Sequence, residues 1–119
     1  MNIRLNSLFE SIDRQDIDAF LAFLSEDAMF RFGNAEPVKG KVSIRDVLHG
    51  FFGSIKALHH DVCDSWDVGN ASVCHGMVAY ARHDSSTLTV PFSNILMAEG
   101  DLISEYLIFA DVSNLHKSA

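Results

Sequence analysis

The chain has 119 residues, with 9 basic and 16 acidic side chains and a formal net charge of −7. This length is typical of one domain, here residues 1–119, and 48% hydrophobic residues can build its core without disulfides or metals. The acidic balance argues against a nucleic-acid partner, which would require a basic face. The apolar runs are too short to span a membrane, so no membrane partner is expected either.

The cysteine and histidine residues indicate neither a disulfide framework nor a metal site. Cys63 and Cys74 are too few to staple a fold and are expected to be buried thiols. His59 and His60 are adjacent, as are Cys74 and His75, so in strands each pair would point to opposite faces. We therefore expect no metal and no cofactor. The first residues lack the apolar core of a signal peptide, which indicates a cytoplasmic protein.

Two short helices are predicted in the first third of the chain. Apolar residues recur there at i, i+3, i+4 and i+7, which is the spacing of one helix face. Asp16 is a suitable N-cap for the second helix, and the polar segment Asp13-Arg14-Gln15 separates the two. The two apolar stripes comprise Leu5, Leu8, Phe9 and Ile12, and then Ile17, Phe20, Leu21 and Leu24.

A short strand and a third helix are predicted next. The strand covers Ala28 to Phe32, and residues 36–40 have the turn chemistry of a loop. Ser43 is a candidate cap for the helix. Gly50 and Gly53 within it would allow another backbone to approach closely. The buried face of this helix is predicted to comprise Ile44, Val47, Leu48, Phe51, Phe52 and Ile55.

The rest of the chain is predicted to form four long strands joined by short turns, which implies an antiparallel meander. Pro91 interrupts the third strand, where we expect a bulge or an unpaired donor. The strands are predicted at His60–Val68, Ser72–His83, Leu88–Ala98 and Leu102–Asp111. Helices first and strands later are typical of an α+β fold in which the helices cover one face of the sheet. A strongly bent sheet of this kind makes a cone that can hold a ligand cavity.

This order of elements resembles the SnoaL-like, ketosteroid isomerase-like branch of the nuclear transport factor superfamily over essentially the whole chain. The segments that carry the resemblance are Asp16–Phe20 followed by Leu24–Ala28, Val38–Gly40 with Ser43–Arg45, and Gly100–Tyr106 continuing to Asp111. The resemblance implies a cystatin-like cone with the N-terminal helices packed in the concave face of a curved, mainly antiparallel sheet. That family spans isomerases, hydrolases, cyclases, dehydratases and non-catalytic association domains, so the fold alone does not define a reaction.

The acids used by two branches of that family are missing at the matching positions. Where the ketosteroid isomerase branch has its general-base aspartate, at the end of the first strand, this sequence has Phe32. The second acid of that branch corresponds to a position near Phe92, and the final-strand aspartate of the epoxide hydrolase branch corresponds to Ile108. These side chains cannot transfer a proton, which disfavours both routes.

A different polar cluster on the two middle strands is the candidate catalytic site. His60 and Asp64 share one face of the first long strand, and Tyr80 and Arg82 share one face of the second. If they converge inside the cone, His60 could move a proton, Asp64 could orient it, and Tyr80 or Arg82 could stabilise developing negative charge. Solvated or satisfied side chains on a sheet are the alternative reading of the same residues.

The register of the two middle strands decides which of these side chains face each other. A three-residue loop would place His60 opposite Tyr80, and this is the register that the family pattern favours. A two-residue Gly69-Asn70 turn would instead set Asp64 opposite His75. A shift of one residue reverses the facing of a whole strand.

The aromatic residues and two polar groups are candidates for binding a small apolar or aromatic molecule. Apolar pockets with a few polar anchors are the usual composition of such sites. The candidate ligand-binding residues are Phe32, Phe52, Trp66, Phe92, Asn94 and Tyr106. We therefore predict a small-molecule-binding protein, acting as an isomerase, cyclase or hydrolase if it is an enzyme. The alternative is a non-catalytic association module, and a homodimer is expected under either reading because the outer sheet face carries apolar residues.

Overall fold

The computed structural model describes residues 4–116, which form three helices and six strands. The helices are α1 (Leu5–Asp13), α2 (Ile17–Leu21) and α3 (Lys41–Gly53). The strands are β1 (Leu24–Phe32), β2 (Val38–Lys39), β3 (Ala57–Val68), β4 (Ala71–Ala81), β5 (Thr87–Glu99) and β6 (Leu102–Ala110).

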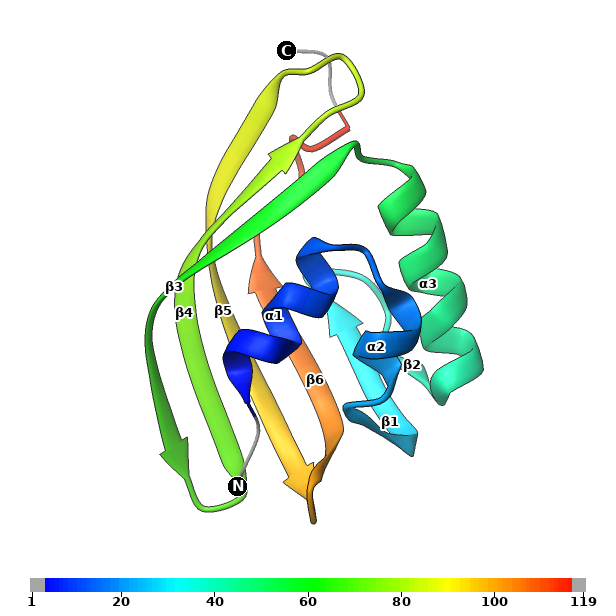
Figure 1. Ribbon diagram of the computed structural model, residues 1–119, viewed down its shortest axis with the longest axis vertical. Coiled ribbons are helices and arrows are strands. Elements are labelled where there is room, and N and C mark those ends of the chain that lie inside the picture. The colour runs from blue at the N-terminus through cyan, green and yellow to red at the C-terminus, as the bar shows by residue number, and fades with distance from the viewer. Residues whose placement is uncertain (1–3, 117–119) are drawn as a thin grey trace.

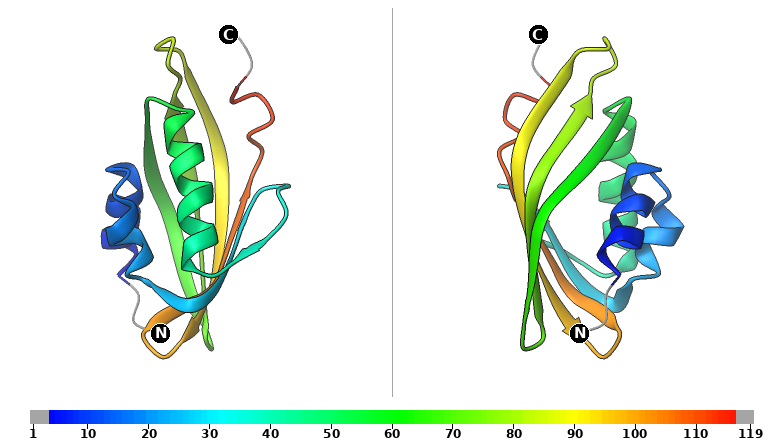
Figure 2. Two further views of the ribbon diagram at one scale, coloured as in Figure 1. Left: turned by 90° about the vertical axis from the view of Figure 1, so that its right-hand side faces the viewer. Right: turned by 60° about the vertical axis from the view of Figure 1, so that its left-hand side comes forward.

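The six strands form one curved sheet in the order β2-β1-β6-β5-β4-β3. Strands β3 to β6 make the predicted antiparallel meander, whereas β1 runs parallel to β6. All three helices lie on the concave side of this sheet (Figures 1 and 2). The α+β class and the cone predicted from the sequence are therefore confirmed.

The two N-terminal helices form where their apolar stripes predict them. Leu8, Phe9 and Ile12 of α1 are buried in the core. The carboxylate of Asp16 accepts a hydrogen bond from the backbone N–H of Ala19 at 3.1 Å, so it caps α2 as predicted. Helix α2 nevertheless ends at Leu21, and the predicted continuation of its stripe to Leu24 is wrong because Leu24 begins β1.

Helix α3 differs from its prediction at both ends. Its N-cap is Gly40, in a left-handed conformation (φ 90°), and not Ser43. Val38 and Lys39, just before the helix, were expected in a loop. They instead form β2, which pairs antiparallel with β1 so that Val38 lies opposite Phe30. A Cβ at Gly50 or Gly53 would meet nothing within 4 Å, so neither glycine accommodates a second backbone. Of the predicted buried face, Val47 is 37% exposed and faces outward, Phe51 is half-buried, and Ile55 is buried but lies beyond the end of the helix.

The register between β3 and β4 overturns the one favoured by the family pattern. Next to the two-residue Gly69-Asn70 turn, Asp64 lies opposite His75 and Trp66 opposite Val73. The register then shifts by one residue between Val62 and Asp64, and His60 lies opposite Val78 rather than Tyr80. Cys63 is the extra residue at this β-bulge, and it is exposed rather than buried as predicted.

Gly76 accommodates the bend of the sheet opposite the bulge. It pairs with Val62 and is itself buried. A Cβ at this position would overlap the backbone carbonyl oxygen of Asp61. Only glycine lets the two strands approach so closely, so Gly76 fixes the place where β3 changes its register.

Of the two alternatives expected at Pro91, a bulge or an unpaired donor, the bulge does not form. The pairing of β4 with β5 runs without a shift from Ala71 opposite Met97 to Ala81 opposite Thr87. Pairing of β5 with β6 begins only at Phe92, one residue beyond the proline. Pro91 therefore lies where β5 has a partner strand on one side alone, a position that tolerates the missing N–H.

Among residues 4–116, no helix has the length and apolar character needed to cross a membrane.

Candidate functional site

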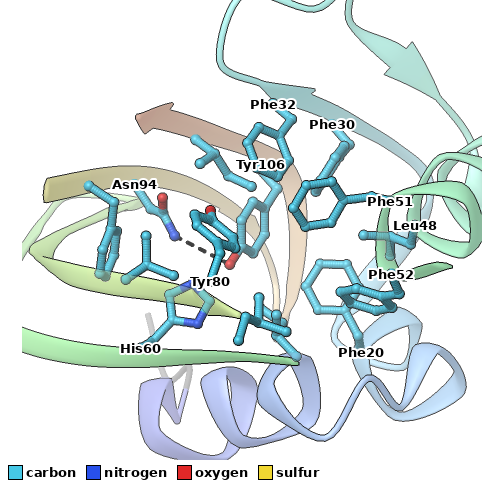
Figure 3. Close-up of a pocket in the computed structure, with 15 residues that line it drawn as sticks. Phe20, Phe30, Phe32, Leu48, Phe51, Phe52, His60, Tyr80, Asn94 and Tyr106 are labelled. Carbon is cyan, nitrogen blue, oxygen red and sulfur yellow. Dashed lines mark hydrogen bonds between the residues drawn. The ribbon is translucent and has the colours of Figure 1, made fainter. Parts of the chain in front are cut away.

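A narrow cavity lies between the concave face of the sheet and the helices (Figure 3). Figure 3 shows the polar side chains gathered on the sheet side, opposite the aromatic and aliphatic side chains of α2 and α3. The sheet supplies His60, Tyr80, Asn94 and Tyr106, among others. The volume open to the centre of a water molecule is ≈ 30 Å³, which is enough for about two waters and no more.

His60 is the strongest candidate for proton transfer, because its imidazole on the cavity wall is held by a carboxylate. Nδ1 of His60 lies 2.6 Å from Oδ1 of Asp13, at the C-terminal end of α1. The other carboxylate oxygen of Asp13 accepts the backbone N–H of His60 at 2.9 Å. Asp13 is thus hydrogen-bonded to both the backbone and the ring of His60. These bonds fix the orientation of the ring and leave Nε2 for a ligand.

Two aromatic rings pack against the His60 imidazole. The ring of Phe9 lies 4.8 Å away between centroids, and that of Phe92 lies 5.2 Å away in an edge-to-face arrangement. The His60 side chain is only 10% exposed and that of Asp13 19%. The pair is therefore shielded from water on most sides, which strengthens its electrostatic interaction.

Asp13 is the residue of the candidate site that sequence reasoning missed. The sequence places it in a polar break between two helices, 47 residues before its partner. One signal could have found it: Asp13 follows Phe9 by four positions and therefore continues the buried face of α1. The orienting carboxylate assigned to Asp64 thus comes from another element.

Asp64 and Trp66 do not reach the cavity. The bulge at Cys63 shifts the register of β3 by one residue, so the side chains beyond it face the opposite side of the sheet from the one expected. Both residues follow the bulge and lie on the convex face, where the Trp66 indole stacks on His75 at 5.6 Å. The Trp66 side chain is 50% exposed. The prediction that Asp64 and Trp66 lie inside the cone is therefore wrong.

Arg82 is also absent from the cavity lining and instead holds the C-terminal turn. Its guanidinium donates to the carbonyl oxygens of Leu115 and Asn114, both at 2.9 Å, and to Oγ of Ser86 at 3.1 Å. It lies past the end of β4, where the chain leaves the sheet. These hydrogen bonds engage three of its five N–H donors and hold the guanidinium at the C-terminal turn, away from the cavity.

The other predicted positions line the cavity. They are His60 and Tyr80 of the candidate catalytic set, and Phe32, Phe52, Phe92, Asn94 and Tyr106 of the candidate ligand-binding set. Ile108 lines it too, and no carboxylate belongs to the described lining. Whether these residues bind a ligand remains the prediction made from the sequence.

Asn94 and Tyr106 form a buried polar pair on β5 and β6. Nδ2 of Asn94 donates to the hydroxyl oxygen of Tyr106 at 3.3 Å, drawn as the dashed line in Figure 3. Within residues 4–116, Oδ1 of Asn94 has no hydrogen-bond partner although it is buried. Buried amide oxygens are normally paired, so this atom marks an incomplete site.

Burial keeps the phenol and thiol groups near the cavity neutral. Desolvation raises the pKa of Tyr80 from 10.0 to about 12 and that of Cys74 from 9.0 to about 11. It raises the pKa of Tyr106 further still. Both tyrosines are therefore hydrogen-bond donors at neutral pH and not bases.

A second, open groove adjoins the cavity on the far side of two phenylalanine rings. Phe32 and Phe51, whose centroids are 4.8 Å apart, line both spaces. The groove has a volume of ≈ 360 Å³, and Val47, Ala110 and Val112 contribute to its lining. The two rings thus separate an accessible space from a nearly filled one.

No group of three or more potential metal ligands lies together in the part of the chain that the structure describes.

The fold and the cavity together define a cone-shaped α+β protein with an apolar interior and a few polar groups on the sheet. The sequence profile of the SnoaL-like domain matches residues 5–106, and the chain therefore belongs to the SnoaL-like family. None of the curated proteins compared with the chain matches its sequence.

Solved structures share this fold at low sequence identity. An NTF2-like protein of unknown function from Burkholderia pseudomallei has a TM-score of 0.85 at 14% identity, covering 93% of this chain and 90% of that one. A candidate polyketide cyclase from Xanthomonas campestris has a TM-score of 0.83 at 18% identity, with the same coverage. TerC, co-crystallised with polyporic acid, has a TM-score of 0.82 at 13% identity, covering 95% of this chain and 92% of that one.

The raised pKa values predict a loss of stability in alkaline solution. The folded state holds the Cys74 and Tyr80 protons more tightly than the unfolded chain does, so their contribution is complete below about pH 9. It is lost between about pH 9 and 12, because the unfolded chain releases these protons first. Each group contributes up to about 1.4 kcal/mol per pH unit to the slope.

Denaturant unfolding at several pH values measures this slope. We expect the Tyr80→Phe variant to lose less free energy of unfolding than the wild type between about pH 10 and 12. Identical pH profiles for the two proteins would contradict the assignment of a raised pKa to Tyr80.

Proposed function

We propose that this SnoaL-like protein binds a small apolar or aromatic molecule in its cone and moves a proton on it, as an isomerase, cyclase or hydrolase would. The observation that carries the proposal is the hydrogen bond between Asp13 and His60, with the imidazole on the wall of an aromatic cavity. A histidine fixed by a carboxylate in a shielded, apolar site is a recurrent arrangement for general acid–base chemistry.

The roles of the residues follow from their hydrogen bonds. Asp13 accepts the Nδ1 proton of His60, so the lone pair of the ring lies on Nε2, the atom that acts as the base. Tyr80 and Tyr106 remain neutral phenols and are the available donors for a developing oxyanion. Asp13 is a positioning residue in this scheme, because it acts through His60.

The proposal requires the cavity to open. Its present volume of ≈ 30 Å³ admits water but no aromatic ligand. Phe51 is the side chain best placed to move, since it is half-buried and separates the cavity from the larger outer groove. A ligand entering from this groove would displace the Phe51 ring from its contact with Phe32.

Two reactions of related branches are not part of the proposal. By the resemblance to those branches, Phe32, a position near Phe92, and Ile108 correspond to the carboxylic acids of the ketosteroid isomerase and epoxide hydrolase routes. The structural neighbours described as a candidate polyketide cyclase and as a complex with polyporic acid support a small-molecule ligand in general terms.

A simple carbon acid tests the proposed base without knowledge of the substrate. When a base removes the carbon-bound proton of a nitrobenzisoxazole, the C–H electron pair forms a nitrile, the N–O bond breaks, and its electron pair leaves on the oxygen as a coloured phenolate. We expect the wild-type protein to accelerate this opening, and His60→Asn to lower the rate by about 100-fold or more. Asp13→Asn should also lower the rate, because Asn cannot enforce the same tautomer of His60. The loss should be smaller, because the imidazole itself remains.

The matched control is His75→Asn, which removes a histidine from the convex face. Its rate should equal that of the wild type. Rates that are equal in the wild type and in His60→Asn, or that fall equally in His75→Asn, would contradict a catalytic role for His60.

A homodimer is the second proposal, and the convex face of the sheet supports it. Trp66 and Phe109 are each 50% exposed on this face, and Met77 is 39% exposed. Large exposed apolar side chains on one face are typical of an interface. We expect sedimentation at micromolar concentration to give a dimer, and Phe109→Lys to shift it to monomer, whereas a monomeric wild type would contradict the proposal.

A further inference from the structure

We propose that Asn94 and Tyr106 form a binding site for one neutral hydroxyl group at the sheet side of the cavity. In the free protein the group is a water molecule, and in a complex it is a hydroxyl of the ligand. The ligand half of this inference rests on the proposed function, whereas the water half does not.

The first observation is the incomplete hydrogen bonding of Asn94. Its side chain lines the cavity and is 2% exposed, and Oδ1 has no partner within residues 4–116. Exchanging the oxygen and nitrogen of the amide does not remove the problem. Tyr106 then bonds the oxygen, and the nitrogen becomes the buried atom that lacks a partner.

The second observation is the hydrogen of the Tyr106 hydroxyl. Its oxygen already accepts from Asn94, and within residues 4–116 no acceptor lies at hydrogen-bond distance from its own proton. Tyr106 is 1% exposed, and burial raises its pKa, so it keeps that proton at neutral pH. The pair thus offers one acceptor, Asn94 Oδ1, and one donor, the Tyr106 hydroxyl.

A hydroxyl group fits this pair better than other oxygen groups do. With the amide oriented so that Nδ2 of Asn94 donates to Tyr106, a hydroxyl donates one hydrogen bond to Asn94 Oδ1 and accepts another from the Tyr106 hydroxyl, whereas a carbonyl would leave Asn94 Oδ1 unpaired. A carboxylate would place an unpaired charge beside neutral phenols in an apolar cavity lined by Val78, Phe92 and Ile108. The open volume of ≈ 30 Å³ accommodates a water with its hydrogen-bond partners.

Phenol and toluene are the probes for the ligand half, because they have nearly the same shape and differ by a hydroxyl against a methyl. We expect the ratio of the phenol affinity to the toluene affinity, measured by NMR titration, to fall about tenfold in Asn94→Leu. Tyr106→Phe, which keeps the ring, should give a loss in the same direction. Val42→Ala is the control, because this side chain is 77% exposed and lies outside the cavity lining, so its truncation should leave the ratio unchanged.

The outcomes separate the two proposals. Phenol and toluene that bind the wild type with a ratio unaltered by Asn94→Leu and Tyr106→Phe would overturn the hydroxyl site while leaving small-molecule binding in place. If neither probe binds the wild type, the small-molecule function fails. The hydroxyl site is then tested in the free protein, by whether a water molecule is bound there. A crystal structure with a water within hydrogen-bond distance of the Asn94 amide supports the site, and a dry amide overturns it. Cooperative thermal unfolding of each variant shows that it is folded.

Discussion

The candidate site depends on one irregularity of the sheet, the bulge at Cys63 opposite Gly76. In the register set by the Gly69-Asn70 turn, His60 would lie opposite Ala79 and would face the convex side. The one-residue shift at the bulge brings His60 opposite Val78 and turns its imidazole into the cone. Gly76 permits the shift, because any side chain there would overlap the carbonyl of Asp61.

The facing of His60 links the sheet to the helices. Once the imidazole points inward, it meets the end of α1, where Asp13 holds both its ring and its backbone N–H. Phe9 from the same helix and Phe92 from β5 close around the ring. The same hydrogen bonds therefore dock α1 on β3 and orient the proposed base, so the packing of the cone and its chemistry share one contact.

The sequence predicted the fold more completely than the site. The long strands and the first helix were found because side-chain alternation and helical spacing are local patterns, and Tyr80, Asn94 and Tyr106 face inward by the same alternation. Asp64 and Trp66 were misplaced because a bulge has no reliable local signature. Asp13 was missed because its contact with His60 spans 47 residues and depends on how a helix packs.

Nitrogen-15 NMR of the histidine side chains tests the central claim most directly, because it reports the facing and the tautomer of His60 together. We expect the His60 ring to carry a proton on Nδ1, hydrogen-bonded to Asp13, and to give nuclear Overhauser contacts to the rings of Phe9 and Phe92. A His60 ring that contacts Ala79 on the convex face, and that populates both tautomers as an exposed histidine does, would contradict it.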